Sequence, residues 1–132
     1  MCGIVGVIAN NQSGIDEEAV ARASELLSRR GPDDCGFWRE ANAAFAHQRL
    51  SILDVSPAGH QPMLSGDGRY VIVYNGEIYN FREIREKIDT DPGSWKSNSD
   101  TEVVLAAYAK WGVGCLDRSE ERRVGKECPQ LC

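Results

Sequence analysis

Apolar and polar residues follow both strand-like and helix-like patterns along this chain. Residues 4–9 form a nearly unbroken apolar run, which predicts a strand buried on both faces. After a turn over residues 10–14, apolar side chains recur at helical spacing, so a helix is expected from Asp16, its N-cap, to about Arg30. Ile15 is placed to pack, as a hydrophobic staple, against the buried face of this helix. The side chains expected on that face are Val20, Ala23, Leu26 and Leu27.

The remaining pattern predicts short strands and two more helices. The strands are expected at residues 36–39, 43–52 and 70–74. A helix over residues 81–88 has Asn80 as its cap, and Glu83 is placed for a reciprocal cap. Another helix begins at the capping box Ser99-Asp100-Thr101-Glu102 and ends at Gly112. Because strands and helices do not alternate regularly, the α+β class is favoured over a doubly wound sheet.

The composition is that of one globular domain. The 132 residues are 42% apolar and 27% charged, which is typical of a folded chain. A net charge of −5 without a basic block argues against nucleic-acid binding. No apolar run approaches the roughly 20 residues that cross a bilayer, and the first residues lack the pattern of a secretory leader. We therefore expect a cytoplasmic protein with no nucleic-acid and no membrane partner.

The cysteines indicate a reduced chain without a metal site. Their number is odd, their spacing is irregular, and they form no zinc-ligand pattern with His47 or His60. An intracellular, reduced protein is therefore the simpler interpretation, and one of the thiols is free for chemistry. The cysteines stand at positions 2, 35, 115, 128 and 132.

Cys2 is the first candidate for that chemistry. Removal of Met1 would give Cys2 a free α-amino group beside its thiol. An α-amino group has an ordinary pKa of about 7.7–8.0, so it can act as the base for a nucleophile on the same residue. From position alone, a small buried thiol beside the first strand is the favoured alternative.

The dipeptide Asn75-Gly76 has two interpretations. Between Tyr74 and Ile78 it is typical of a type I′ hairpin turn, and taken alone this interpretation is the stronger. Alternatively, the Asn75 amide and the Gly76 N–H could both donate to a developing negative charge, as in an oxyanion hole.

Arg49 and Asp100 are candidates for substrate recognition. Arg49 lies in an apolar segment, where a guanidinium is costly to bury unless a carboxylate meets it. It could pair with an internal aspartate or with a substrate, and the sequence favours neither. Asp100 fits a helix start but could equally face a substrate ammonium. Together with Cys2 and the Asn75-Gly76 pair, these groups would suit an amino acid with a side-chain amide, which is the outline of a glutaminase.

Six short strings carry the most specific information in the chain. They are Met1-Cys2-Gly3-Ile4-Val5-Gly6, Arg30-Gly31-Pro32-Asp33-Asp34, Ala46-His47-Gln48-Arg49-Leu50-Ser51-Ile52-Leu53-Asp54, Gln61-Pro62-Met63, Tyr74-Asn75-Gly76-Glu77-Ile78-Tyr79-Asn80 and Ser99-Asp100-Thr101-Glu102. In this order they resemble the class II glutamine amidotransferase domain of glutamine-hydrolysing asparagine synthetases. The resemblance covers residues 1 to about 117.

The resemblance implies a fold and a catalytic mechanism. The fold would be an N-terminal-nucleophile hydrolase, an αββα sandwich of antiparallel sheets, in truncated form. Cys2, exposed by loss of Met1, would attack the side-chain amide of glutamine and use its own α-amino group as the base. Asn75 and the Gly76 N–H would hold the oxyanion.

The resemblance also implies how glutamine would be held. Arg49 would bind its α-carboxylate, and Asp100 would bind its α-ammonium with help from Glu77. The residues that would line the site are Leu50, Ser51, Ile52 and Leu53.

In this family a second domain uses the ammonia, with ATP and magnesium, to make asparagine from aspartate. This chain has no Ser-Gly-Gly-x-Asp-Ser nucleotide loop, so no cofactor is expected in it. The implied partners are glutamine and a synthetase domain of the same parent chain, which could be a homodimer. An inactive or regulatory fragment is the alternative, as is a parent that amidates another carboxylate such as a sugar acid.

The family pattern stops near residue 117. Residues 118–132 resemble the translation of a common sequencing adapter, so we expect a foreign tail after a native part at 1–117. A genuine divergent tail is the alternative. We also expect the chain alone to be poorly soluble or inactive, because missing strands would leave sheet edges and apolar faces uncovered.

Overall fold

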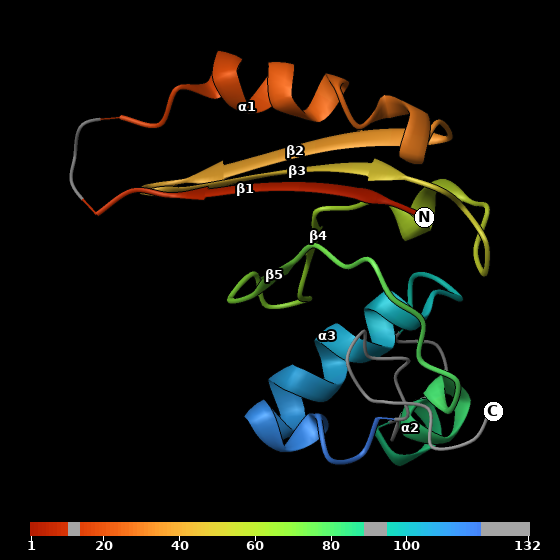
Figure 1. Ribbon diagram of the computed structural model, residues 1–132. Helices are drawn as coiled ribbons and strands as arrows, with labels where there is room; N and C mark the ends of the chain where they lie inside the picture. The colour runs from red at the N-terminus through yellow and green to blue at the C-terminus, as the bar shows by residue number, and fades with distance from the viewer. Residues whose placement is uncertain (11–13, 89–94, 120–132) are drawn as a thin grey trace, which may run out of the picture.

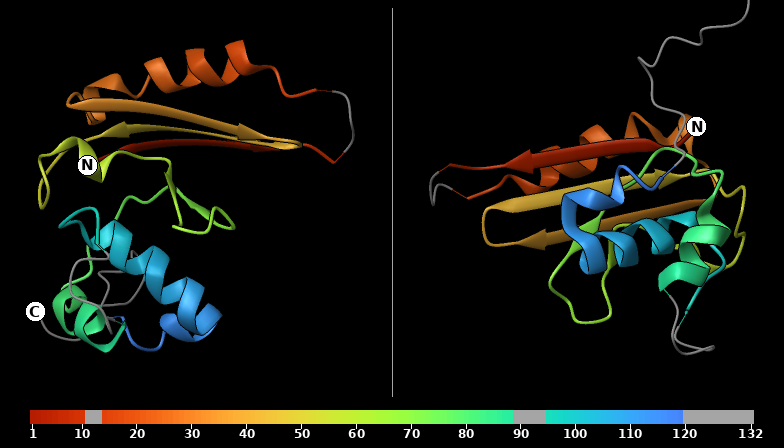
Figure 2. Two further views of the ribbon diagram at one scale, coloured as in Figure 1. Left: turned by 180° about the vertical axis from the view of Figure 1, so that it is seen from behind. Right: turned by 90° about the horizontal axis from the view of Figure 1, so that it is seen from below.

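The computed structural model describes residues 1–10, 14–88 and 95–119, which form an α+β arrangement in layers (Figure 1). A helix covers one face of an antiparallel sheet, and a short strand pair with two further helices lies beyond the other face. Two more views show the same order of layers (Figure 2). The elements are β1 (Gly3–Ile8), α1 (Glu17–Glu25), η1 (Ser28–Arg30), β2 (Asp34–Glu40), β3 (Ala43–Arg49), η2 (Pro57–Gly59), β4 (Met63–Leu64), β5 (Val71–Ile72), α2 (Phe81–Ile88), α3 (Asp100–Trp111) and η3 (Gly112–Cys115).

The larger sheet has the strand order β1-β3-β2, and both pairings are antiparallel. Gly3 lies opposite Gln48, and Asp34 lies opposite Arg49. The start of β1, the end of β3 and the start of β2 therefore meet at one end of the sheet. Cys2 precedes β1 by one residue, so it belongs to this end too.

Alternation along β3 separates two packing regions. Ala44 and Ala46 face α1 and form a buried cluster with Ile15 and Val20. His47 points to the opposite face, where its ring reaches the segment that follows β5. A single strand thus connects the α1 layer with the other half of the structure.

The second half is built on α3. This helix packs against α2 and against β5, which pairs with β4. Its buried side chains Val103 and Ala107 form a cluster with Ile78, Ile84 and Cys115. This half therefore has its own apolar core, beside the sheet face that α1 does not cover.

The short-range predictions are mostly confirmed. Asp16 caps α1, with its carboxylate accepting a hydrogen bond from the Ala19 N–H at 2.9 Å. Ser99 caps α3, which ends at Gly112 with a φ of 57°, and α2 has the predicted bounds. The α+β class is confirmed as well, with antiparallel pairings in both sheets.

Two predictions about burial are wrong. β1 is a strand but not a doubly buried one, because it is an edge strand and Ile8 on it is 69% exposed. The first long helix ends early, since α1 stops at Glu25 and η1 follows. The break turns Leu26 to solvent, where it is 85% exposed instead of packing beside Val20.

Candidate functional site

Cys2 lies where β1 begins, against the chain that leaves β3. Its half-buried thiol accepts a hydrogen bond from the Leu50 N–H at 3.3 Å, and the Sγ atom is 3.7 Å from the Leu50 carbonyl oxygen. The Arg30 side chain donates to the Cys2 carbonyl at 3.3 Å. Met1 is 75% exposed. The thiol is therefore held by backbone contacts, while the residue before it stands in solvent.

Arg49 is the last residue of β3 and is only 7% exposed. Its guanidinium donates to the carbonyl oxygens of Ser56, at 3.0 Å, and of Asp54. Among the described residues it forms no ion pair with a carboxylate. A Cβ at position 59 would collide with the guanidinium, so Gly59 leaves the room that Arg49 occupies. The hydrogen bonds of this buried charge thus go to neutral carbonyls, the Asp54 carboxylate interacts with it electrostatically, and the described residues leave some of its N–H donors unused.

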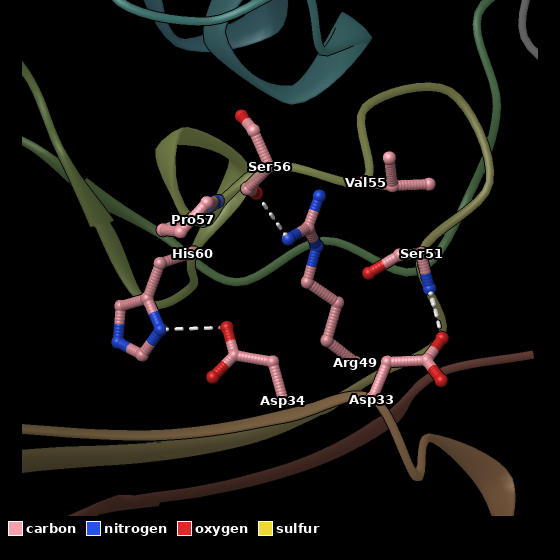
Figure 3. Close-up of a pocket in the computed structure, with 8 residues that line it drawn as sticks. All are labelled: Asp33, Asp34, Arg49, Ser51, Val55, Ser56, Pro57 and His60. Carbon is pink, nitrogen blue, oxygen red and sulfur yellow. Dashed lines mark hydrogen bonds and ion pairs between the residues drawn. The ribbon is translucent and has the colours of Figure 1, made fainter.

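A pocket of about 630 Å³ surrounds the Arg49 side chain (Figure 3). The side chain rises from the sheet toward the loop that carries Val55 and Ser56. On one side of the pocket, the Ser51 N–H donates to the Asp33 carboxylate at 2.7 Å. The lining residues are Asp33, Asp34, Arg49, Ser51, Val55, Ser56, Pro57 and His60.

His60 and Asp34 close another side of this pocket. His60 Nδ1 lies 2.7 Å from the Asp34 carboxylate (Figure 3). The contact requires the chain after η2 to lie directly on β2, and a Cβ at Gly36 would collide with the Gln61 carbonyl oxygen. The glycine in β2 therefore allows a loop carrying site residues to reach the sheet.

The four residues from Leu50 to Leu53 are not equivalent. Leu50 contacts the Cys2 thiol and Ser51 lines the pocket. Ile52 and Leu53 are exposed, and neither is among the residues that line it. The structure thus places Leu50 against the candidate nucleophile, Ser51 on the pocket around Arg49, and the last two residues on the surface.

The Asn75-Gly76 dipeptide is not a type I′ turn. That turn needs a positive φ at both central residues, and neither Asn75 nor Gly76 has one. The dipeptide is exposed and follows Tyr74, whose backbone is fixed on both sides. The Tyr74 N–H donates to the Gln61 side chain at 2.6 Å, and the Tyr74 carbonyl accepts from His47 Nε2 at 3.1 Å. The hairpin interpretation is therefore wrong, and an irregular segment with a braced start takes its place.

Asp100 is the first residue of α3 and is buried. Its carboxylate accepts a hydrogen bond from the Ile78 N–H at 3.1 Å. Burial raises the pKa of this carboxyl, the Ile78 N–H opposes that shift, and the nearby Glu77 charge adds to it. Glu77 itself is exposed. Asp100 therefore holds the chain after the Asn75-Gly76 dipeptide, and a charge on its buried carboxylate costs free energy.

The described contacts form two groups of candidate residues. One group holds Cys2, Leu50, Ser51 and Arg49 at the end of the large sheet. The other holds Asn75, Gly76, Glu77 and Asp100 at the start of α3. His47 connects them, because it pairs with Ile4 in the sheet and donates to the Tyr74 carbonyl.

Sequence reasoning missed the buried side chains that brace these groups. His47, Asp54 and Gln61 are buried, and each contacts backbone distant in the chain. Each lies inside a string that carried the family resemblance, which was the available signal.

In the described ranges, no cluster of three or more His, Cys, Asp or Glu side chains is arranged to hold a metal ion. None of the helices described is long and apolar enough to cross a membrane.

Comparison with known proteins identifies the class. Residues 1–121 match the family described as the glutamine amidotransferase domain, so the chain belongs to this family. It is similar to the glutamine-hydrolysing asparagine synthetase 3 of Bacillus subtilis, with 38% identity over 121 residues, which is 89% of this chain and 19% of that protein. It also resembles asparagine synthetase B of Escherichia coli, with 38% identity over 118 residues, or 89% of this chain and 21% of that protein. The chain thus spans about a fifth of the length of these relatives.

Proposed function

We propose that this chain hydrolyses the side-chain amide of glutamine, with Cys2 as the nucleophile after removal of Met1. The observation that carries the proposal is Arg49, a buried arginine that lines a pocket and forms no ion pair with a carboxylate among the described residues. The residue that follows it, Leu50, contacts the Cys2 thiol. A buried cation whose neighbour in the chain contacts a thiol would suit an amino acid substrate, which carries both a carboxylate and a group to be attacked.

The proposed reaction has two steps. The Cys2 thiolate adds to the amide carbon, and the α-amino group that accepted its proton delivers a proton to the departing ammonia. Asn75 and the Gly76 N–H stabilise the oxyanion of each tetrahedral intermediate. Water then hydrolyses the thioester, which releases glutamate and restores the thiol. This chemistry corresponds to an N-terminal-nucleophile hydrolase, and we extend the α+β fold to a truncated αββα sandwich on that basis.

Two charges would hold the glutamine backbone. Arg49 would bind the α-carboxylate with the N–H donors that its carbonyl contacts leave unused. Asp100 would bind the α-ammonium, with Glu77 beside it. Binding an ammonium would also compensate the cost of the buried Asp100 charge, because opposite charges favour the ionised carboxylate. Leu50 and Ser51 would line the path to Cys2, with Ile52 and Leu53 at its rim.

The ammonia would serve a larger protein. The relatives are named as glutamine-hydrolysing asparagine synthetases, and this chain spans about a fifth of their length. We therefore infer a cytoplasmic parent in which a synthetase domain consumes the ammonia, with ATP and magnesium bound there and aspartate as the acceptor. The boundary at residue 117, the foreign tail over 118–132 and a homodimeric parent stay predictions; residues 120–132 lie outside the described residues.

The proposed function is tested by measuring glutamate release from glutamine. The proposal expects turnover by the full-length parent, in which the missing strands are present, and none after Cys2→Ala in that parent. The control is Cys35→Ala, because Cys35 is an exposed cysteine on the α1-facing side of β2. Activity that survives Cys2→Ala would contradict the proposal. A folded chain without turnover would favour the inactive-fragment alternative.

A further inference from the structure

Asp54 lies on the loop between Arg49 and His60, and it is buried. Its backbone carbonyl accepts a hydrogen bond from the Arg49 guanidinium. One carboxylate oxygen accepts from the Ser56 N–H at 2.8 Å, and the Ser56 carbonyl accepts from Arg49 at 3.0 Å. Asp54 therefore shapes the turn whose two carbonyls hold the guanidinium in place.

The second carboxylate oxygen of Asp54 reaches a different part of the chain. It accepts a hydrogen bond from the Asn98 N–H at 2.7 Å, across 44 positions of sequence. Asn98 lies two residues before Asp100 and directly before Ser99, the N-cap of α3. One carboxylate thus joins the turn that holds Arg49 to the start of the helix that carries Asp100.

The start of α3 can carry a displacement of Asn98 to Asp100, because hydrogen bonds hold this segment together. The Ser99 hydroxyl accepts from the Glu102 N–H at 3.3 Å. The Glu102 carboxylate in turn accepts from the Ser97 N–H at 2.7 Å and from the Lys96 N–H at 2.9 Å. Residues 96–102 therefore form one hydrogen-bonded unit. A displacement of Asn98 would be carried to Asp100 through this unit.

We propose that Asp54 is a positioning residue that sets the spacing between Arg49 and Asp100, and so selects substrates carrying both an α-carboxylate and an α-ammonium. This inference rests on the proposed function, in which Arg49 and Asp100 hold those two charges. The hydrogen bonds that Asp54 accepts from Ser56 and Asn98 keep the pKa of its carboxyl below the ordinary value, so the Asp54 side chain is ionised at neutral pH. An ionised acceptor makes shorter and stronger bonds to the N–H groups of Ser56 and Asn98 than a neutral one would.

The test compares glutamine with glutaric acid monoamide, which keeps the carboxylate and the amide but lacks the α-ammonium. Asp54→Asn replaces an accepting oxygen with an amide, so one of the two backbone contacts is lost at almost constant volume. We expect the KM for glutamine to rise about tenfold, with kcat within about twofold, because one charge-assisted hydrogen bond is removed. The kinetic constants for glutaric acid monoamide should not change, so the preference for glutamine over this compound falls by the same factor.

Two further variants separate positioning from folding. Asp54→Ser keeps a short acceptor for the Ser56 N–H but cannot reach Asn98, so it should show the same KM effect. Asp67→Asn is the control, since Asp67 accepts from the Arg69 N–H in an exposed turn away from the pocket. Equal losses for both substrates, or an unchanged glutamine KM, would overturn the proposal.

The inference and the proposed function fail in different ways. If the unmodified chain binds glutamine in a calorimetric titration but does not hydrolyse it, the proposed catalysis fails. The spacing role is then judged by the same comparison of the two ligands in binding, with the same expected factor. If the unmodified chain does not bind glutamine at all, both proposals are overturned.

Discussion

His47 Nε2 lies 3.1 Å from the Tyr74 carbonyl oxygen, so the central strand of the sheet holds the residue that precedes Asn75. The His47 side chain is fully buried, and its other ring nitrogen has no hydrogen-bond partner among the described residues. The neutral ring with a proton on Nε2 fits this environment, since it donates to the carbonyl and leaves no charge in the core. The candidate oxyanion segment thus depends on an uncharged histidine.

The stability of the fold should therefore depend on pH near the titration of His47. Burial keeps the pKa of His47 below its ordinary 6.5; Arg49 and His60 act in the same direction, and the Tyr74 carbonyl and Asp34 oppose it. The unfolded chain then takes up this proton first as the pH falls. Stability should be full above about pH 6.5 and should decrease as the pH drops from there toward the lowered pKa.

Chemical denaturation at several pH values measures this dependence. His47→Gln keeps an N–H donor for the Tyr74 carbonyl but does not titrate. The variant should be less stable at neutral pH, because its side chain fills the site less well, yet it should lose part of the acid dependence. An unchanged acid dependence in His47→Gln would assign the effect to another group.

Arg49→Lys tests the carboxylate clamp. Lysine keeps the charge but cannot form the planar, two-pronged contact that a guanidinium makes with a carboxylate. The KM for glutamine should rise by about tenfold or more, with a smaller change in kcat. Arg39→Lys is the matched control, because Arg39 also lies on the large sheet but pairs with Glu17 on the surface. Equal kinetics for the two variants would contradict the proposed role of Arg49.

Asn75→Ala tests the oxyanion interpretation. Loss of one oxyanion donor typically raises the barrier by about 2.7–4 kcal/mol, which corresponds to a decrease in kcat of roughly 10²–10³. The stability should change little, because Asn75 is exposed. Steady-state kinetics and thermal unfolding of the same preparation check both expectations. A variant with near-normal kcat would exclude Asn75 as an oxyanion donor.

Gly36→Ala tests the close approach of the loop to β2. The added methyl group would collide with the Gln61 carbonyl and lie 2.7 Å from His60 Nε2. We expect the free energy of unfolding to fall by about 1–3 kcal/mol, as overpacking usually causes. Gly66→Ala is the control, since a Cβ there would meet nothing within 4 Å. Equal stabilities of the two variants in denaturant titrations would refute this explanation of Gly36.

The fold was predictable from the sequence wherever local interactions decide it. The caps at Asp16 and Ser99 need only a contact three residues away, and both are present. The burial of β1 was not predictable in this way, because it depends on which elements cover each face of the sheet. Leu26 was misplaced for a related reason: the pattern predicted one continuous helix, whereas α1 ends one residue before it.

The candidate site shows the same difference between local and long-range interactions. Cys2 and Arg49 could be selected as candidates from residue types and their neighbours in sequence, although their roles stay predictions. The bridges made by Asp54 and Gln61 could not, because their partners lie 44 and 13 positions away. The Asp54 contact arises only when the loop after β3 folds onto the start of α3, and the Gln61 contact only when that loop meets the segment after β5. Sequence patterns identify candidate reacting groups more readily than the residues that would position them.

The central claim is that Cys2, with a free α-amino group, is the nucleophile of a glutamine site. The most direct test treats the full chain with a glutamine-analogue electrophile and locates the label by peptide mass spectrometry, after an intact-mass measurement. We predict that Met1 is absent, that Cys2 carries the label, that excess glutamine protects it, and that Cys35 and Cys115 remain unmodified. Retention of Met1, or labelling of the exposed Cys35 to the same extent as Cys2, would contradict the claim.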